Sequence, residues 1–126
     1  MRKTFKKYNE FLNEKISFNT DTTGREDWDE DLRKHSKDFT QILVSMSPAD
    51  FLKRVQYHRF EIDKDKVANY VKEFRGNAKD IPSPTMWFTD KFQYDKGLSP
   101  AFHDGSHRML ALQEVGIKEV PVKIIY

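Results

Sequence analysis

The chain has 126 residues, a formal net charge of +2 and no cysteine. This length suits one domain with a real hydrophobic core, which ten phenylalanines and two tryptophans help to fill. The lack of cysteine excludes disulfides, thiolate metal sites and thiol catalysis. The balance of acidic and basic residues predicts no broad basic surface. No apolar run approaches the length of a membrane span, so we expect a cytoplasmic protein with no membrane partner.

We expect residues 1–40 to form a helical extension. Apolar residues recur at helical spacing over 4–16, which predicts an amphipathic helix that packs on the domain or docks on a partner protein. The start of this helix is similar to the head-targeting segments of some tailed-phage proteins, which hints at a phage source. Residues 17–26 read as a loop. Residues 27–37 predict a short surface helix, whose many acidic groups indicate a solvated face rather than a metal site.

Residues 41–126 predict an α/β (α+β) domain with a small mixed β-sheet and packed helices. Strands are predicted over 40–44, 85–89, 99–103 and 120–126. Ser47 and Pro48 are a start signal for a helix that runs to residue 57, and Asp63 caps a helix that Gly76 ends. Turn residues over 90–97 predict a hairpin or a longer connection.

The stretch 104–108, Asp-Gly-Ser-His-Arg, stands between a predicted strand and a predicted helix. Asp104 and Gly105 form a turn pair, Ser106 is a good helix N-cap, and Gly116 is the expected stop. The first turn of this helix offers unpaired backbone N–H groups and the positive end of the helix dipole. It therefore predicts an anion site, and phosphate is the anion that most often fills one.

Each side chain of this stretch has a chemical role and a structural alternative. Arg108 offers a planar fork that binds phosphate oxygens bidentately, or it is a surface residue. His107 donates or moves a proton near neutral pH, or it is a core histidine. Asp104 holds a metal-bound water, accepts a proton from a hydroxyl substrate, or caps the turn. Gly105 and Ser106 contribute backbone donors. His103 points to the opposite face of the strand from Asp104.

Asp-Gly-x-His-Arg at a helix start, followed by Gly-Ile-x-x-Val-Pro-Val over 116–122, resembles the ParB/sulfiredoxin superfamily. Residues 63–74 are similar to the helix that precedes the central strands of sulfiredoxin, and 81–88 to its proline-led strand. The resemblance covers about residues 44–126. It implies a ParB/sulfiredoxin-like fold that binds ATP or another nucleotide.

The resemblance also implies roles for single residues. Lys66 falls on an ATP-contacting lysine, and Asn69 falls on a nucleotide contact. Glu73 falls on a further contact position, where it is a poor neighbour for phosphate. Ser106 replaces the reactive cysteine of sulfiredoxin, so we do not expect sulfinic acid reduction. The free-serine kinase branch takes a glutamate base from an upstream segment, and Glu61 is the candidate for it.

These observations leave three functions open. The first is a nucleotide-binding phosphotransferase or nucleotide hydrolase, with Asp104, His107 and Glu61 as catalytic groups and Mg²⁺ bridging the phosphates. The second is a nuclease or DNA accessory factor that takes a backbone phosphate in the same site. The third is a non-enzymatic interaction protein, such as a phage factor that binds a host protein. No all-protein metal site is predicted.

Overall fold

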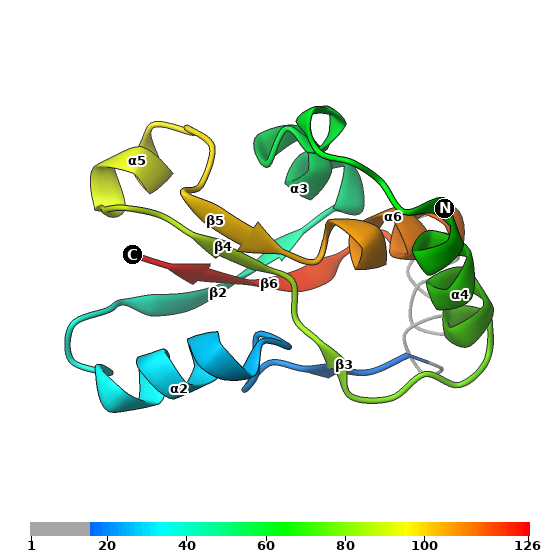
Figure 1. The fold of residues 1–126 in the computed structure, drawn as a ribbon, viewed down its shortest axis with the longest axis horizontal. Coiled ribbons are helices and arrows are strands. Elements are labelled where there is room, and N and C mark those ends of the chain that lie inside the picture. Colours follow the sequence, from blue (N-terminus) through cyan, green and yellow to red (C-terminus); the bar gives the residue numbers. More distant parts are fainter. Residues whose placement is uncertain (1–15) are drawn as a thin grey trace, which may run out of the picture.

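The computed structural model describes residues 16–126, and its centre is a four-stranded mixed sheet (Figure 1). The strands, in the order β2-β6-β4-β5, are β2 (Gln41–Met46), β6 (Val120–Ile125), β4 (Thr85–Trp87) and β5 (Phe102–Asp104). β6 pairs antiparallel with β2 and parallel with β4, and β4 pairs antiparallel with β5. The prediction of an α/β fold with a small mixed sheet is confirmed. No helix in the described part of the chain is long and apolar enough to cross a membrane.

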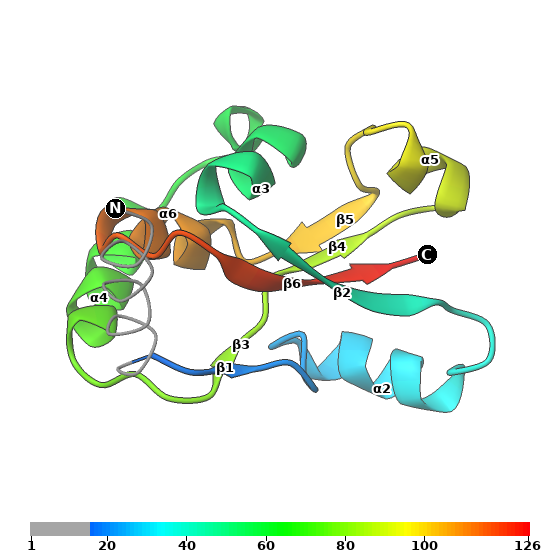
Figure 2. The same ribbon diagram turned by 180° about the vertical axis from the view of Figure 1, so that it is seen from behind.

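One side of the sheet carries α3 (Pro48–Arg54) and α6 (Ser106–Glu114), and α4 (Lys64–Arg75) packs on α6 beyond the strand ends (Figures 1 and 2). The alternation along β6 directs Val122 and Ile124 toward this face, where both are fully buried. Phe51 of α3 and Met109 and Leu112 of α6 complete the centre of the core, each with 0% of its surface exposed. α6 packs on both α3 and α4, so its first turn is held between them.

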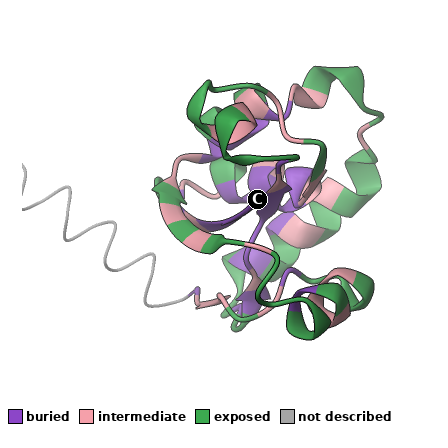
Figure 3. Cartoon of the chain, turned by 90° about the vertical axis from the view of Figure 1, so that its left-hand side faces the viewer, coloured by how far each residue is buried: buried purple, intermediate pink, exposed green. Residues whose placement is uncertain are grey.

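The opposite face of the sheet is covered by α2 (Glu26–Lys34) (Figure 2). Trp28 of α2 meets Trp87 of β4 edge to face, with ring centroids 5.7 Å apart, and Phe39 does the same at 5.0 Å. Leu32 and Ile125 are buried with them. Figure 3 shows the buried residues concentrated at the sheet, between these two layers.

The first described residues are paired with the body of the domain. β1 (Phe18–Asn19) runs parallel to β3 (Ile81–Pro82), and Ile16 joins the core with 5% of its surface exposed. The prediction of a loop over 17–26 is therefore wrong at β1, because a two-residue strand depends on a distant partner and has no local periodicity. The amphipathic helix predicted over 4–16 lies, apart from Ile16, outside the described residues.

The other predicted elements differ mainly at their ends. Ser47 and Asp63 cap α3 and α4 through their side chains, as predicted. α3 ends at Arg54 rather than at residue 57, and a short 3-10 turn, η1 (Tyr57–Arg59), follows. The hairpin or connection predicted over 90–97 instead contains a helix, α5 (Lys91–Asp95). Asp90 caps α5 by accepting a hydrogen bond from the Gln93 amide.

Candidate anion-binding site

α6 begins directly at the end of β5, and Gly105 rather than Ser106 is its N-cap. Gly105 has φ +116°, and its carbonyl accepts the first intrahelical bond, from the Met109 amide at 2.8 Å. The prediction of a Ser106 cap is wrong because the left-handed glycine already ends the turn, which makes Ser106 the first helical residue. No side chain caps this end. The first-turn amides of α6 therefore have no intrahelical partner.

Only glycine fits at the turn that starts α6. A Cβ at Gly105 would lie 2.8 Å from the Cβ of Pro84 and 3.0 Å from Nη2 of Arg108. The positive φ adds strain for any other residue. Gly105 thus brings the backbone of the helix start close to the segment that joins β3 to β4.

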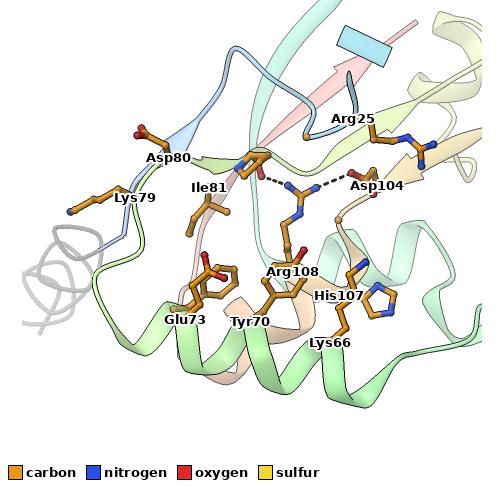
Figure 4. A pocket seen from close by; sticks show the side chains of 14 residues that line it. Arg25, Lys66, Tyr70, Glu73, Lys79, Asp80, Ile81, Asp104, His107 and Arg108 are labelled. Atoms are coloured by element: carbon orange, nitrogen blue, oxygen red, sulfur yellow. Dashed lines mark hydrogen bonds and ion pairs between the residues drawn. The ribbon is translucent and has the colours of Figure 1, made fainter. Parts of the chain in front are cut away.

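A cavity of about 290 Å³ opens beside the start of α6 (Figure 4). One face of α4 forms a wall, because Lys66, Tyr70 and Glu73 follow one another at helical spacing. The segment that leads into β3 and the residues before α2 close the other sides. The cavity contains four basic and three acidic side chains: Arg25, Lys66, Lys79, Arg108, Glu73, Asp80 and Asp104.

Arg108 lies deep in this cavity, with 7% of its side chain exposed. Its Nη1 donates to the Pro82 carbonyl at 2.5 Å, and its Nη2 donates to Asp104 Oδ2 at 3.1 Å (Figure 4). Burial lowers the pKa of Arg108, and the charges of Asp104 and Tyr70 oppose this effect. The fork that the sequence assigns to phosphate thus already holds two protein acceptors. The guanidinium fixes the positions of Asp104 and of the β3 segment, and it adds a buried positive charge to the cavity.

His107 projects from the first turn of α6 toward α4. Its Nε2 accepts a hydrogen bond from the Asp63 amide at 3.1 Å, at the N-cap of α4. In the neutral ring this bond places the proton on Nδ1. His107 and Lys66 border both the cavity and a neighbouring groove. His107 therefore joins the two helices and presents an N–H donor.

The remaining predicted site residues divide between the cavity and its surroundings. Gly105 lines the cavity, whereas Ser106 is buried and its Oγ has no hydrogen-bond partner among the described residues. Glu61 is exposed and lines the neighbouring groove with His107 and Lys66. Asn69 is exposed on α4 and does not line the cavity. The structure thus brings Asp104, His107, Arg108 and Lys66 together, with Glu61 at their margin.

Sequence reasoning missed Arg25, Tyr70, Lys79 and Asp80. Tyr70 had a usable signal, because it follows Lys66 by four residues and therefore shares its helix face. The other three lie in segments without periodicity, and they reach the cavity through the pairing of β1 with β3 and through the docking of α2. No local pattern marks such positions.

The cavity does not contain a ready metal site. Among the described residues no group of three His, Cys, Asp or Glu side chains is placed to hold a metal ion. Oδ2 of Asp104 is also engaged with Arg108. The described residues therefore do not fit a metal held by the protein alone.

The chain matches no protein-family model, no curated protein and no solved structure. The resemblance to the ParB/sulfiredoxin superfamily therefore stays a prediction that depends on the residues quoted above.

Proposed function

We propose that this protein binds a nucleotide by its phosphates at the start of α6. The observation that carries the proposal is the uncapped first turn of α6, which opens into a cavity bordered by Lys66 and His107. Backbone N–H groups and the helix dipole favour a phosphate there. Lys66 adds a mobile positive charge from α4, and the Nδ1–H of His107 adds a directed donor.

The charge of the cavity supports an anion at this place. The buried Arg108 guanidinium contributes positive charge, and among residues 16–126 Asp104 is the one carboxylate paired with it. The excess of positive charge in the cavity is small, since three acidic side chains accompany four basic ones. Such a cavity suits a phosphate ester that the backbone N–H groups and His107 hold by hydrogen bonds.

The reaction that fits this arrangement is phosphoryl transfer or nucleotide hydrolysis. Such reactions need positioning and charge stabilisation more than covalent chemistry from the protein. Arg108 holds Asp104 in one orientation beside the N-terminus of α6. There the carboxylate of Asp104 accepts the proton of an attacking hydroxyl or water. Glu61 lies in the groove on the other side of His107 and is the second candidate for this base.

Titration calorimetry with ATP, CTP, GTP and tripolyphosphate, each with and without Mg²⁺, tests the binding. Lys66→Ala should lower the affinity for the preferred ligand roughly five- to tenfold, because it removes one charge-assisted contact. Lys72→Ala is the matched control, since Lys72 is exposed on the same helix and does not line the cavity. Equal affinity in wild type and Lys66→Ala, or no binding of any phosphate compound, would contradict the proposal.

Turnover is measured separately, as nucleoside diphosphate or inorganic phosphate released from the nucleotide that binds. Asp104→Asn should remove turnover while the nucleotide still binds, because the amide keeps a hydrogen-bond acceptor for Arg108 but cannot take a proton. A short DNA duplex that binds more tightly than every nucleotide, with a steep dependence on salt, would instead favour the DNA-associated function.

A further inference from the structure

A second cleft lies next to the anion cavity, on the other side of Asp104. Its volume is about 670 Å³, and its walls come from the start of α2, the segment after α3 and the edge strand β5. The two hollows share one lining residue and meet at β5. His103 lines the cleft, its neighbour Asp104 lines the cavity, and Arg25 borders both.

Three aromatic side chains line the cleft: Trp28, Phe60 and Phe102. Phe60 and Phe102 are exposed over 53% and 64% of their surface. Trp28 makes a T-shaped contact with Trp87, and the guanidinium of Arg25 lies over the Trp28 ring, 4.8 Å from its centroid. A flat, unsaturated ring system can stack on a cleft that is lined by exposed aromatic rings and arginines.

The polar groups of the cleft are held in place by the protein. Gln56 donates to Ser99 Oγ at 2.9 Å and accepts from Arg59 Nη1 at 2.9 Å, so one side chain connects three parts of the wall. His103 lies edge to face with Phe60 at 4.9 Å and with Phe51 at 6.5 Å. Burial lowers the pKa of His103, with Asp104 opposing, so its ring is neutral at pH 7 and offers one donor and one acceptor.

We infer that this cleft holds the base of the nucleotide whose phosphates lie at the start of α6. The inference rests on the proposed function. Its ground is the proximity of the cleft to the cavity, because Arg25 lines both and the adjacent residues His103 and Asp104 line one each. The cavity alone has about 290 Å³, which is at the lower limit of roughly 300–1,000 Å³ for small-molecule sites. The phosphates fill it, and the attached base needs a second, aromatic space.

Calorimetry on Phe102→Ala, with a nucleoside triphosphate and with tripolyphosphate as ligands, separates the two parts. Phe102 is largely exposed, so the variant should fold. We expect the variant to bind the nucleotide roughly tenfold more weakly, because stacking is lost, and to bind tripolyphosphate with unchanged affinity. Phe92→Ala is the matched control, because Phe92 is 63% exposed on α5 and outside the cleft.

The outcomes distinguish this inference from the proposed function. If tripolyphosphate binds as tightly as the nucleotides and Phe102→Ala changes neither, the base site is wrong and the phosphate site stands. If no phosphate compound binds, both are wrong. A thymidine oligonucleotide that binds more tightly than thymidine triphosphate and is weakened by Phe102→Ala would show that the base belongs to a single strand. The reverse order would show a free nucleotide.

An optical measurement gives a second readout. The chain has two tryptophans, and Trp28 alone lines the cleft. In Trp87→Phe, the fluorescence of Trp28 should be quenched by a nucleotide and not by tripolyphosphate. Equal spectra with and without a nucleotide that calorimetry shows to be bound would overturn the assignment of the base to this cleft.

Discussion

The guanidinium of Arg108 joins segments that are distant in the chain. It bonds the Pro82 carbonyl at the end of β3 and the carboxylate of Asp104 at the end of β5. Gly105 allows this because the space that a Cβ would take is filled by Pro84 and by Arg108 itself. At the residue scale, contacts within the protein therefore fix Asp104, Gly105 and Arg108 without a ligand.

Substitution at Gly105 tests this close approach. Gly105→Ala should lower the free energy of unfolding by roughly 3 kcal/mol, because it combines an unfavourable positive φ with a clash against Pro84. Gly116→Ala is the matched control. Gly116 also has positive φ (+88°), but nothing lies within 4 Å of its added Cβ, so only about 1 kcal/mol should be lost. Urea unfolding of both variants measures the difference, and equal losses would contradict the packing argument.

Arg108→Ala should also be destabilising, by about 3 kcal/mol, because Asp104 and the Pro82 carbonyl lose their partner and a buried volume is emptied. Chemical denaturation without ligand measures this loss. A variant as stable as wild type would show that Arg108 has no structural role. Loss of nucleotide binding in Arg108→Ala is thus ambiguous, and Lys66→Ala is the better probe of the ligand.

At the scale of elements, the docking of α2 sets the outer wall of both hollows. Asp29, in the first turn of α2, accepts hydrogen bonds from Thr22 Oγ1 at 2.5 Å and from the Thr23 amide at 2.8 Å. Burial acts to raise the pKa of Asp29, but the threonine hydrogen bonds and the charge of Lys123 lower it overall. This link holds the loop that carries Arg25 against the sheet.

Asp29→Ala should therefore cost about 2 kcal/mol of stability at pH 7, whereas Asp31→Ala, at an exposed position of the same helix, should cost less than about 0.5 kcal/mol. Because the pKa of Asp29 is lower in the folded protein, its contribution is present above the unfolded pKa near 4. It disappears as the pH falls through the folded pKa. Thermal unfolding at pH 7 and at low pH measures both effects. A loss that is unchanged at low pH would contradict this origin.

Local signals were sufficient for some elements and insufficient for others. Ser47 and Asp63 predict the starts of α3 and α4, because a side-chain N-cap depends only on the next few residues. β1 depends on a partner more than sixty residues away, and no nearby residue marks it. At the site, Asp104, His107 and Lys66 line one cavity, and Lys66 is assigned there through the family resemblance rather than through a local pattern. The sequence misses Arg25, whose place depends on tertiary packing.

At the scale of the whole molecule, two neighbouring hollows lie along the end of β5 and share Arg25. The anion cavity and the aromatic cleft both border this strand, and His103 and Asp104 face them in turn. His103 is half-buried between Phe51 and Phe60. The stability of the whole domain is therefore linked to the protonation of this ring.

Because burial lowers the pKa of His103 in the folded state, the unfolded chain takes up the proton first as the pH falls. Stability should decrease below the unfolded pKa of about 6.5, by at most ~1.4 kcal/mol per pH unit. His103→Gln should flatten this dependence, while His58→Gln, at an exposed position, should not. Urea unfolding at pH 5 to 8 gives the slopes. Equal slopes in wild type and His103→Gln would refute the linkage.

The most direct measurement of the central claim is a titration of ¹⁵N-labelled protein with ATP, followed by amide chemical shifts. If phosphates bind at the start of α6, the amides of Ser106, His107 and Arg108 should move most and saturate together, because they lie at its uncapped end. Shifts that are absent from these three amides at saturating nucleotide, or largest at the far edge of the sheet on β2, would contradict the account.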